Sequence, residues 1–327
     1  MREALYWEKS DGHVRCRLCP HECLIADGRS GLCLARKNQA GCLKSLSYGQ
    51  VTSANLDPVE KKPLFHFYPG RQIFSIGTFG CNLRCPFCQN WTISQQVVET
   101  EELSPDRANE IAERYKSIGI AFTYNEPFIW FEYVLDTAKK ARAMGLKNVL
   151  VTNGFVNEKP LLELLPYIDA MNIDIKAMDE YFYKEKLSGR LMPVLRTVEL
   201  SHSSCHVELT NLLIPTLNDS VKMIERLVDW VADLSPDIPM HFSRYFPQYK
   251  FSLPPTSLAT LDQAGEIARK KLRYVYMGNV VDDESNTTFC PGCRKPLIER
   301  HGYSIARNDI VNGRCRHCDY SIKGVFK

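Results

Sequence analysis

Three cysteines stand close together in the run TFGCNLRCPFCQNW, where Cys81, Cys85 and Cys88 have the spacing C-x3-C-x2-C. Three soft thiolates on one short loop suit a [4Fe–4S] cluster in which one iron keeps an open position. A structural zinc site needs a fourth ligand, and the nearest candidates, Cys42 and His66, lie too far along the chain to be presumed. The spacing therefore favours an iron–sulfur cluster over zinc.

A second cysteine group precedes this loop and has the spacing C-x2-C-x3-C-x9-C. It consists of Cys16, Cys19, Cys23 and Cys33, with His21 inside it. Four soft ligands in so short a segment are costly to bury unless they share an ion, so we expect a metal site. Zinc knuckles usually contain two C-x2-C pairs and this group contains one, which leaves zinc and an iron–sulfur cluster both open.

A third group lies near the end of the sequence as two C-x2-C pairs, Cys290 with Cys293 and Cys315 with Cys318. Paired knuckles at this interval are typical of a four-thiolate zinc ribbon, and less often of a rubredoxin-like iron site. Residues 290–327 carry eight Lys and Arg against three acids, a net charge of +5. That charge allows contact with nucleic acid or an acidic partner, although no pattern of stacking aromatic residues accompanies it.

The composition is that of an ordinary globular protein. The chain has 327 residues, of which 44% are hydrophobic, and a net charge of +3, which is too small to demand nucleic acid. It has no apolar run long enough for a membrane span and no leader-like N-terminus, so we expect a cytoplasmic protein. Thirteen cysteines, nearly all in short groups, indicate metal ligation rather than disulfides.

From residue 73 onward, β-rich runs alternate with amphipathic helices. The expected strands are 72–78, 119–124, 147–152, 168–175, 206–214, 239–244 and 274–279. This alternation predicts an α/β fold of parallel strands with right-handed crossovers, closed partly or completely into a (β/α) barrel. An open doubly wound sheet is the alternative, but the G-x-G-x-x-G turn typical of its dinucleotide-binding members is missing.

The connecting helices carry start signals and apolar faces. Ser104 with Pro105 predicts a helix start, a second helix is expected over 127–144, and a last one over 257–270. Residues 218–220 are expected to cap a further helix. The apolar faces of the first and the capped helix are expected to be Ala108, Ile111, Ala112, Tyr115 and Ile118, and Val221, Ile224, Leu227, Val228 and Val231.

Polar residues stand at or near the ends of the expected strands, where barrels of this kind place their active sites. They are Asn125, Glu126, Asn153, Asp174, Lys176 and Asn211. Alternation along a strand puts Asp174 and Lys176 on one face. For Glu126 the alternative is a charge that stabilises a helix N-terminus, and for Asp174 and Lys176 it is an interior ion pair.

The motif C-x3-C-x-Φ-C, with Phe87 before its last cysteine, resembles the signature of radical S-adenosylmethionine (radical SAM) enzymes. The resemblance implies that Cys81, Cys85 and Cys88 hold a [4Fe–4S] cluster and that SAM binds its open iron. Reductive cleavage of SAM would then give a 5′-deoxyadenosyl radical that abstracts a hydrogen atom. It implies SAM contacts at Phe87, Asn125, Glu126, Asn153, Asp174, Lys176 and Asn211. Residues 124–126 depart from the family's Gly-Gly-Glu element but keep the acid, and a late-strand histidine of the family's activating enzymes is matched loosely by His241.

A closer resemblance covers nearly the whole chain and includes TYNEP, NLLIPTLNDS, HFSRYFP and both flanking cysteine groups. The chain resembles the radical SAM proteins of the AmmeMemoRadiSam system, which are similar to pyruvate formate-lyase activating enzymes. This implies an electron donor such as flavodoxin or ferredoxin, and Memo-type and AMMECR-type partners. The substrate is a partner protein or a small molecule. No catalytic acid or base is assigned.

Three domains are expected: a cysteine-rich segment over 1–70, a barrel over 71–281 and a zinc-ribbon-like module over 282–327. A hypothesis from another class is a non-catalytic metal scaffold or nucleic-acid-binding protein built on the two flanking modules. It predicts salt-dependent binding to polynucleotide and no cleavage of SAM.

Overall fold

The computed structural model describes residues 1–280 and 284–327 of the chain. The chain divides into two compact units, each assembled from separate stretches. The first contains residues 1–57, 72–171 and 180–205, and the second contains 58–71, 172–179 and 206–327. The boundary expected between residues 281 and 282 lies outside the described residues.

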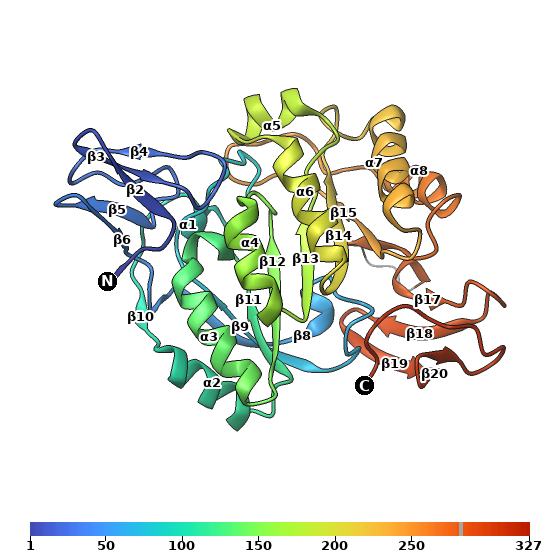
Figure 1. Ribbon diagram of the computed structural model, residues 1–327. Coiled ribbons are helices and arrows are strands. Elements are labelled where there is room, and N and C mark those ends of the chain that lie inside the picture. The colour runs from blue at the N-terminus through green and yellow to red at the C-terminus, as the bar shows by residue number, and fades with distance from the viewer. Residues whose placement is uncertain (281–283) are drawn as a thin grey trace. The chain divides into compact units, whose positions relative to one another are not determined.

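The parallel strands and helices of the first unit follow the expected alternation (Figure 1). Strands β9 (Gln72–Gly77), β11 (Gly119–Phe122) and β12 (Lys147–Thr152) pair in parallel, and α2 (Pro105–Arg114) and α3 (Phe131–Ala143) pack against them. All four residues of β11 are buried, which is typical of a parallel strand covered on both faces. The expected helix over 127–144 consists of the 3-10 turn η2 (Pro127–Trp130) followed by α3.

The second unit contains the strands β14 (His206–Leu213), β15 (Met240–Arg244) and β16 (Val275–Gly278), which also pair in parallel. Helices α7 (Val221–Leu234) and α8 (Leu258–Arg269) connect them.

With β8 (Ser53–Pro58) and β13 (Ala170–Asp174), the strand order is β16-β15-β14-β13-β12-β11-β9-β8. The expected α/β class is confirmed.

The helix starts are where the sequence predicts them. Ser104, Ser220 and Ser257 are the N-caps of α2, α7 and α8, and each side chain accepts a backbone N–H three residues later. Of the ten positions expected on the apolar faces, six are buried, Ile111 and Ile118 are half-buried, and two are exposed. Tyr115 is 58% exposed because α2 ends at Arg114, and Val221 is 41% exposed at the first turn of α7, so their assignment to the buried faces is wrong.

The two flanking cysteine groups lie among small antiparallel sheets, with Cys16 and Cys315 on strands and the other six cysteines on the connections. Near the N-terminus the sheets are β1 (Arg2–Glu3), β6 (Cys42–Ser45) and β5 (Arg36–Gln39), and β2 (Trp7–Ser10), β3 (His13–Cys16) and β4 (Leu24–Ile25). Near the C-terminus they are β17 (Thr288–Phe289), β18 (Pro296–His301) and β19 (Ser304–Asn308), and β20 (Ile310–Val311) with β21 (Arg314–Cys315).

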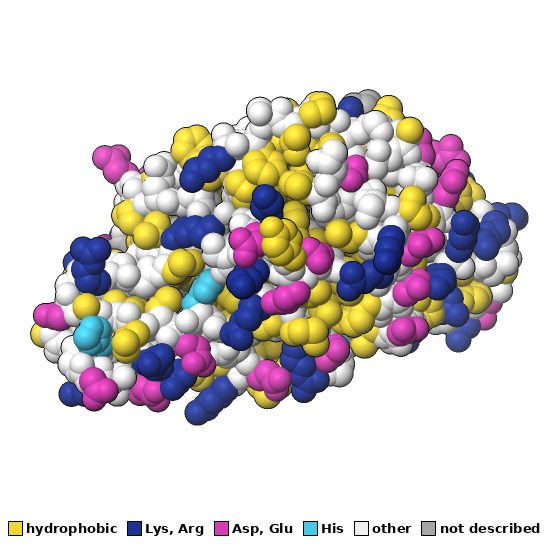
Figure 2. Space-filling model, turned by 90° about the horizontal axis from the view of Figure 1, so that it is seen from above, with side chains coloured by type: hydrophobic (Ala, Val, Ile, Leu, Met, Phe, Trp, Pro, Cys, Tyr) yellow, Lys and Arg dark blue, Asp and Glu magenta, His cyan; other side chains and the backbone are white. Residues whose placement is uncertain are grey.

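The remaining elements are short connections and helices. They are β7 (Gln50–Val51), η1 (Val59–Lys61), α1 (Trp91–Ser94), β10 (Glu101–Glu102), α4 (Glu158–Leu164), η3 (Leu165–Tyr167), α5 (Glu180–Leu187), α6 (Leu191–His202) and η4 (Glu284–Asn286). None of the helices in the described parts of the chain is long and apolar enough to cross a lipid bilayer. Basic and acidic side chains are interspersed on the face shown in Figure 2, as a small net charge leads one to expect.

Candidate active site

The three central cysteines lie on the loop that leaves β9 and ends at α1. The backbone N–H of Leu83 lies 3.4 Å from the Sγ of Cys81, and the hydroxyl of Ser94 lies 3.1 Å from the Sγ of Cys88. The N–H of Cys88 donates to the carbonyl of Cys85 over 3.3 Å. Hydrogen bonds to sulfur, such as those at Cys81 and Cys88, orient thiolates and stabilise their negative charge, as the ligands of an iron–sulfur cluster require.

Asn125, predicted as a cofactor contact, holds this loop in place. Its Oδ1 accepts the N–H of Thr78 over 3.1 Å, and its Nδ2 donates to the carbonyl of Gly80 over 2.9 Å. Both bonds fix the backbone just before Cys81. The structure therefore gives the Asn125 side chain a positioning role, and its predicted contact with SAM stays a prediction.

Glu126 is buried and its carboxylate accepts several hydrogen bonds from its own unit. Oε1 accepts the N–H of Phe128 over 2.9 Å and the hydroxyl of Thr152 over 2.7 Å, and Oε2 accepts the N–H of Asn153 over 2.8 Å. The carboxylate thus caps the N-terminus of η2, which is the alternative that the sequence left open. It also ties the end of β11 to the end of β12.

Asn153 reaches the cysteine loop directly. Its Nδ2 lies 3.6 Å from the Sγ of Cys81 and donates to the Oδ1 of Asn82 over 2.9 Å. Its Oδ1 accepts the N–H of Phe155 over 2.8 Å, which fixes the orientation of the amide. Asn153 is therefore a direct neighbour of a predicted cluster ligand.

The environment of Cys81 disfavours a bare thiolate. Burial, with smaller contributions from the Glu126 carboxylate and the thiol of Cys85, raises the pKa of Cys81 well above its usual value. A thiolate is stable at this position only beside a compensating positive charge, and a metal centre supplies one. Phe87, on the same loop, is 3% exposed, and its ring lies 6.2 Å from that of Phe182 on α5.

In the second unit, Asp174 and Lys176 form an ion pair of 2.7 Å, with side chains 27% and 16% exposed. Asn211 on β14 fixes the backbone of residues 175 and 176. Its Nδ2 donates to the carbonyls of Ile175 over 2.7 Å and Lys176 over 3.3 Å. The ion pair is again the alternative that the sequence left open. The roles of these three side chains toward SAM stay predictions.

His241, the loosely matched late-strand histidine, lies 2% exposed in the second unit. Its Nε2 is 2.7 Å from the Oε2 of Glu208, whose Oε1 also contacts His206 over 2.9 Å. The same carboxylate accepts the backbone N–H groups of Phe65 and His66. In the structure, His241 therefore belongs to a buried hydrogen-bond network.

The C-terminal cysteines converge on one point. Their four sulfurs lie within 4.8 Å of one another, with 3.5 Å between Cys290 and Cys318 and 3.7 Å between Cys293 and Cys315. A single tetrahedral ion with metal–sulfur bonds of about 2.3 Å needs sulfurs at roughly such separations. A backbone hydrogen bond at Lys295 lowers the pKa of Cys293 to about 7, which favours a metal-binding thiolate. This group fits one bound metal ion.

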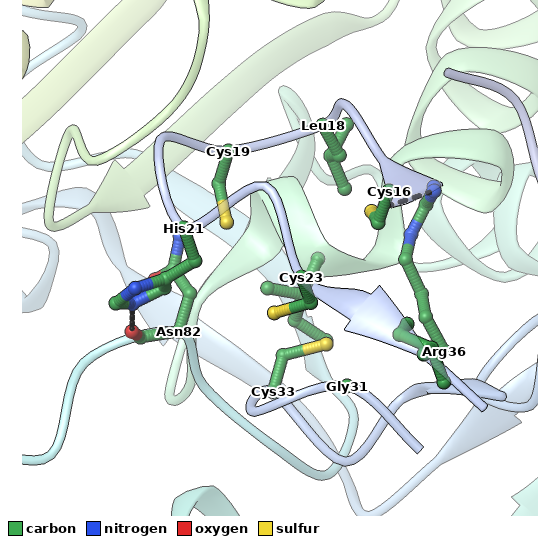
Figure 3. Close-up of a pocket in the computed structure, with 11 residues that line it drawn as sticks. Cys16, Leu18, Cys19, His21, Cys23, Gly31, Cys33, Arg36 and Asn82 are labelled. Atoms are coloured by element: carbon green, nitrogen blue, oxygen red, sulfur yellow. Dashed lines mark hydrogen bonds between the residues drawn. The ribbon is translucent and has the colours of Figure 1, made fainter. Parts of the chain in front are cut away.

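The four N-terminal cysteines line a common cavity in the first unit (Figure 3). Sequence reasoning missed two polar residues of its wall, Arg36 and Asn82. Arg36 is 1% exposed and forms an ion pair with the buried Glu132 of α3. No local signal marks Arg36, because its partner is 96 residues away, whereas Asn82 follows a predicted ligand directly.

Comparison with known proteins places this site in a family. The profile described as the radical SAM superfamily matches residues 75–231, which contain the loop of Cys81, Cys85 and Cys88. An uncharacterised protein of Methanocaldococcus jannaschii is 43% identical to the chain over 98% of the chain and 99% of its own length. The chain belongs to the radical SAM superfamily. It is an enzyme of this type, so the hypothesis of a non-catalytic scaffold is wrong.

Other relatives of this radical SAM enzyme have more informative names. A putative glycyl-radical enzyme activating enzyme of M. jannaschii is 26% identical over 76% of the chain and 99% of its own length. The pyruvate formate-lyase-activating enzyme of Clostridium pasteurianum is 25% identical over 47% of the chain and 67% of its own length. The expected likeness to pyruvate formate-lyase activating enzymes is confirmed.

Among solved structures, Streptococcus suis SuiB bound to S-adenosylmethionine superimposes with a TM-score of 0.51 at 14% identity. The match covers 68% of the chain and 53% of SuiB, and it supports the fold alone. Radical SAM enzymes work with a [4Fe–4S] cluster and SAM. The three thiols of this chain fit such a cluster, with two N–H donors near Cys81 and the Ser94 hydroxyl hydrogen-bonded to Cys88.

Proposed function

We propose that this enzyme holds a [4Fe–4S] cluster at Cys81, Cys85 and Cys88, binds SAM beside it and removes a hydrogen atom from a partner protein. The observation that carries the proposal is the loop after β9, where Cys81 accepts from Leu83 and Asn153 and Cys88 shares a hydrogen bond with Ser94. The names of the relatives support the second half, since one is named a pyruvate formate-lyase-activating enzyme and another a putative glycyl-radical enzyme activating enzyme.

The chain's own residues prepare this chemistry. Asn125 fixes the backbone before Cys81, and Asn153 donates toward its sulfur. Glu126 holds the backbone of Asn153 in place. A cluster held by Cys81, Cys85 and Cys88 would supply the single electron that reductive cleavage of SAM needs. The proposed SAM contacts are Phe87, Asn125, Glu126, Asn153, Asp174, Lys176 and Asn211.

A second candidate is modification of a small molecule together with Memo-type and AMMECR-type partners. Its support is the resemblance of nearly the whole chain, with both cysteine-rich modules, to the AmmeMemoRadiSam-system proteins. In either case we propose a flavodoxin or ferredoxin as electron donor and the cytoplasm as location. We also propose zinc at Cys290, Cys293, Cys315 and Cys318, and modules over 1–70, 71–281 and 282–327.

The test is anaerobic formation of 5′-deoxyadenosine. Protein reconstituted with iron and sulfide and reduced with dithionite is given SAM, and the product is measured by chromatography. We expect formation by the unaltered enzyme and by Cys42→Ala, whose cysteine lies on β6 outside all three groups, and none by Cys85→Ala. A cluster-loaded enzyme that binds SAM and never forms 5′-deoxyadenosine contradicts the proposal.

The substrate class needs a separate measurement. Candidate partner proteins are added to the reduced enzyme with SAM, and the mixture is frozen for electron paramagnetic resonance. A carbon-centred radical that stays on the partner after the two proteins are separated supports the activating function. Product formation that depends on a small molecule and leaves no radical on any protein favours the second candidate.

A further inference from the structure

The cavity of the N-terminal module gathers four thiols, with His21, Arg36 and Asn82 as the other polar residues of its lining. Cys16 ends β3, Cys19 and Cys23 lie on the turn to β4, and Cys33 lies on the loop before β5. Figure 3 shows the sulfurs of Cys19, Cys23 and Cys33 directed toward a common space. The wall between them is largely apolar, with Leu18, Ile25 and Ile129. None of the thirteen cysteines forms a disulfide.

The backbone around the cavity is shaped to present these thiols. The N–H of Cys16 donates to the carbonyl of Cys23 over 3.0 Å, which closes the turn that carries three of them. Gly31 lies so close that an added Cβ would stand 3.7 Å from the Sγ of Cys23 and 3.1 Å from the Cδ1 of Ile25. Arg36 donates to the Sγ of Cys16 over 3.9 Å from the wall of the same cavity. A hydrogen-bond donor beside the sulfur of a prospective metal ligand is an outer-shell contact of the kind that orients such ligands.

The spacing of the sulfurs distinguishes the three cysteine groups. A single tetrahedral ion draws four sulfurs close together, and the C-terminal group shows this arrangement, with all four within 4.8 Å. Within residues 1–280 and 284–327 no other three His, Cys, Asp or Glu ligand atoms come so close to one another. The four N-terminal thiols line one cavity without forming such a group, and Cys81, Cys85 and Cys88 do not form one either. Thiols that share a cavity without converging on one point suit an iron–sulfur cluster, because its thiolates bind different irons.

The cavity also adjoins the loop of the proposed SAM cluster. Asn82 lines it, and its carbonyl lies 2.7 Å from the Nε2 of His21, inside the N-terminal group. The Oδ1 of Asn82 accepts from Asn153, which in turn reaches the Sγ of Cys81. On the other side, a Cβ added to Gly80 would stand 2.2 Å from the carbonyl oxygen of Cys33. The two groups of thiols share a wall within the first unit.

We propose that Cys16, Cys19, Cys23 and Cys33 bind an iron–sulfur cluster, and that this cluster takes up the electron from the donor protein and passes it to the neighbouring site. The metal assignment stands on the thiol geometry alone, whereas the electron-carrying role rests on the proposed function. The N-terminal cluster accepts one electron from a reduced one-electron donor and passes one electron to the neighbouring site. No bond is made or broken in the module.

Metal analysis tests the assignment without any activity measurement. The variant Cys81→Ala/Cys85→Ala/Cys88→Ala is purified anaerobically, and iron, acid-labile sulfide and zinc are measured per chain. We expect iron with an equal amount of sulfide, an iron–sulfur absorption band, and about one zinc from the C-terminal group. About two zinc ions per chain without iron would overturn the proposal. The absence of any metal beyond the C-terminal ion would overturn it too.

The complementary variant is Cys19→Ala/Cys23→Ala, with Cys42→Ala as the matched control from the same module. The double variant is expected to lose the iron and sulfide of the N-terminal module, which the triple variant retains. It is expected to keep the iron and sulfide bound at Cys81, Cys85 and Cys88, whereas the control keeps the iron and sulfide of both sites. If the double variant does not fold, the triple variant still decides the metal. Equal iron and sulfide in the double variant and the control contradicts the assignment.

The electron-carrying role is tested by changing the reductant. With reduced flavodoxin, 5′-deoxyadenosine formation by Cys19→Ala/Cys23→Ala is expected to fall by roughly tenfold or more relative to Cys42→Ala. With dithionite, which is small enough to reduce either site, the difference is expected to shrink. Equal rates with flavodoxin overturn the role. Failure of the unaltered enzyme with dithionite contradicts the proposed function instead, so the two failures are distinguishable.

Discussion

The ion pair of Arg36 and Glu132 is an unusual charged feature of the first unit, because the side chains are 1% and 0% exposed. Arg36 also donates to the carbonyl of Leu5 over 2.8 Å, and Glu132 accepts the N–H of the same residue over 2.7 Å. The pair therefore fixes the N-terminal strand region from both sides. Removing one partner leaves the other charge buried without compensation, which is far more costly than the pair's net contribution.

Removing either partner is expected to destabilise the protein strongly. We expect Arg36→Met and Glu132→Gln each to lower the free energy of unfolding by about 3–5 kcal/mol. The double variant is expected to lose clearly less than the sum, because neither charge is then left alone. Chemical denaturation under anaerobic conditions measures the three values. Strict additivity would show that the two side chains do not depend on each other.

A second residue-scale prediction concerns pH and His66, which is buried in the second unit. Burial lowers the pKa of His66 from its ordinary value of 6.5 to about 4. Its Nδ1 lies 2.7 Å from the carbonyl of Lys323 and its Nε2 lies 2.6 Å from the hydroxyl of Tyr276. These partners suit the neutral ring, with Nδ1 as donor and Nε2 as acceptor.

Because the folded pKa lies below the unfolded one, only the unfolded state takes up a proton on His66 between pH 6.5 and about 4. Its contribution to stability is present above pH 6.5 and is lost as the pH falls, by up to about 1.4 kcal/mol per pH unit. Unfolding free energies measured between pH 7 and 5.5 are expected to show this slope. His66→Gln should make this pH dependence shallower, by at most one proton at the lower end of the range. An unchanged slope in His66→Gln contradicts the assignment.

At the scale of elements, the loop after β9 is packed directly on the loop that carries Cys33. Gly80 has a φ of +90° and no room for a side chain, since a Cβ would meet the carbonyl oxygen of Cys33 at 2.2 Å. Gly145, after α3, has a similar φ of +77° but open space around it. The two glycines separate the effect of backbone strain from the effect of loop packing.

We therefore expect Gly145→Ala to cost only about 1 kcal/mol of unfolding free energy, from the strained φ alone. Gly80→Ala is expected to cost clearly more and to lower the iron bound per chain, because the two loops must separate. Denaturation and iron analysis of both variants measure this. Equal iron content in Gly80→Ala and the unaltered enzyme would show that the cysteine loops do not depend on their contact.

At the scale of the whole molecule, the C-terminal metal group forms part of the core of its unit. Cys290 and Cys315 are 0% and 2% exposed, and they pack in one cluster with Phe65, Tyr276 and Leu297. An ion bound at these four cysteines would hold together strands that are too short to fold by themselves. Its removal should weaken the second unit rather than only an appendage.

Loss of this metal is expected to expose β18 and β19 to hydrogen exchange. We expect Cys290→Ser/Cys315→Ser to lose about one zinc per chain and amide protection over residues 296–308, and to unfold at a lower temperature. Iron at Cys81, Cys85 and Cys88 should remain, which analysis of the same sample shows. Cys42→Ser is the control. Unchanged amide protection in the zinc-free protein would contradict a structural role for the ion.

Features that depend on neighbouring residues could be predicted from the sequence. The alternation of strands and helices, the N-caps at Ser104, Ser220 and Ser257, and the three cysteine groups are all set by spacing along the chain. Two expected buried positions, Tyr115 and Val221, failed because they lie at helix ends, where a few degrees of rotation or one residue of length decides burial.

What lies next to these elements was decided by the tertiary structure alone. Asn153 meets Cys81 across 72 residues of sequence, and Arg36 meets Glu132 across 96. The sequence left Glu126 between two roles and the N-terminal metal open, because both depend on distances between segments remote in the chain. Spacing along a chain determines which ligands are available, and only packing between remote segments determines how far apart their sulfurs stand and what surrounds them.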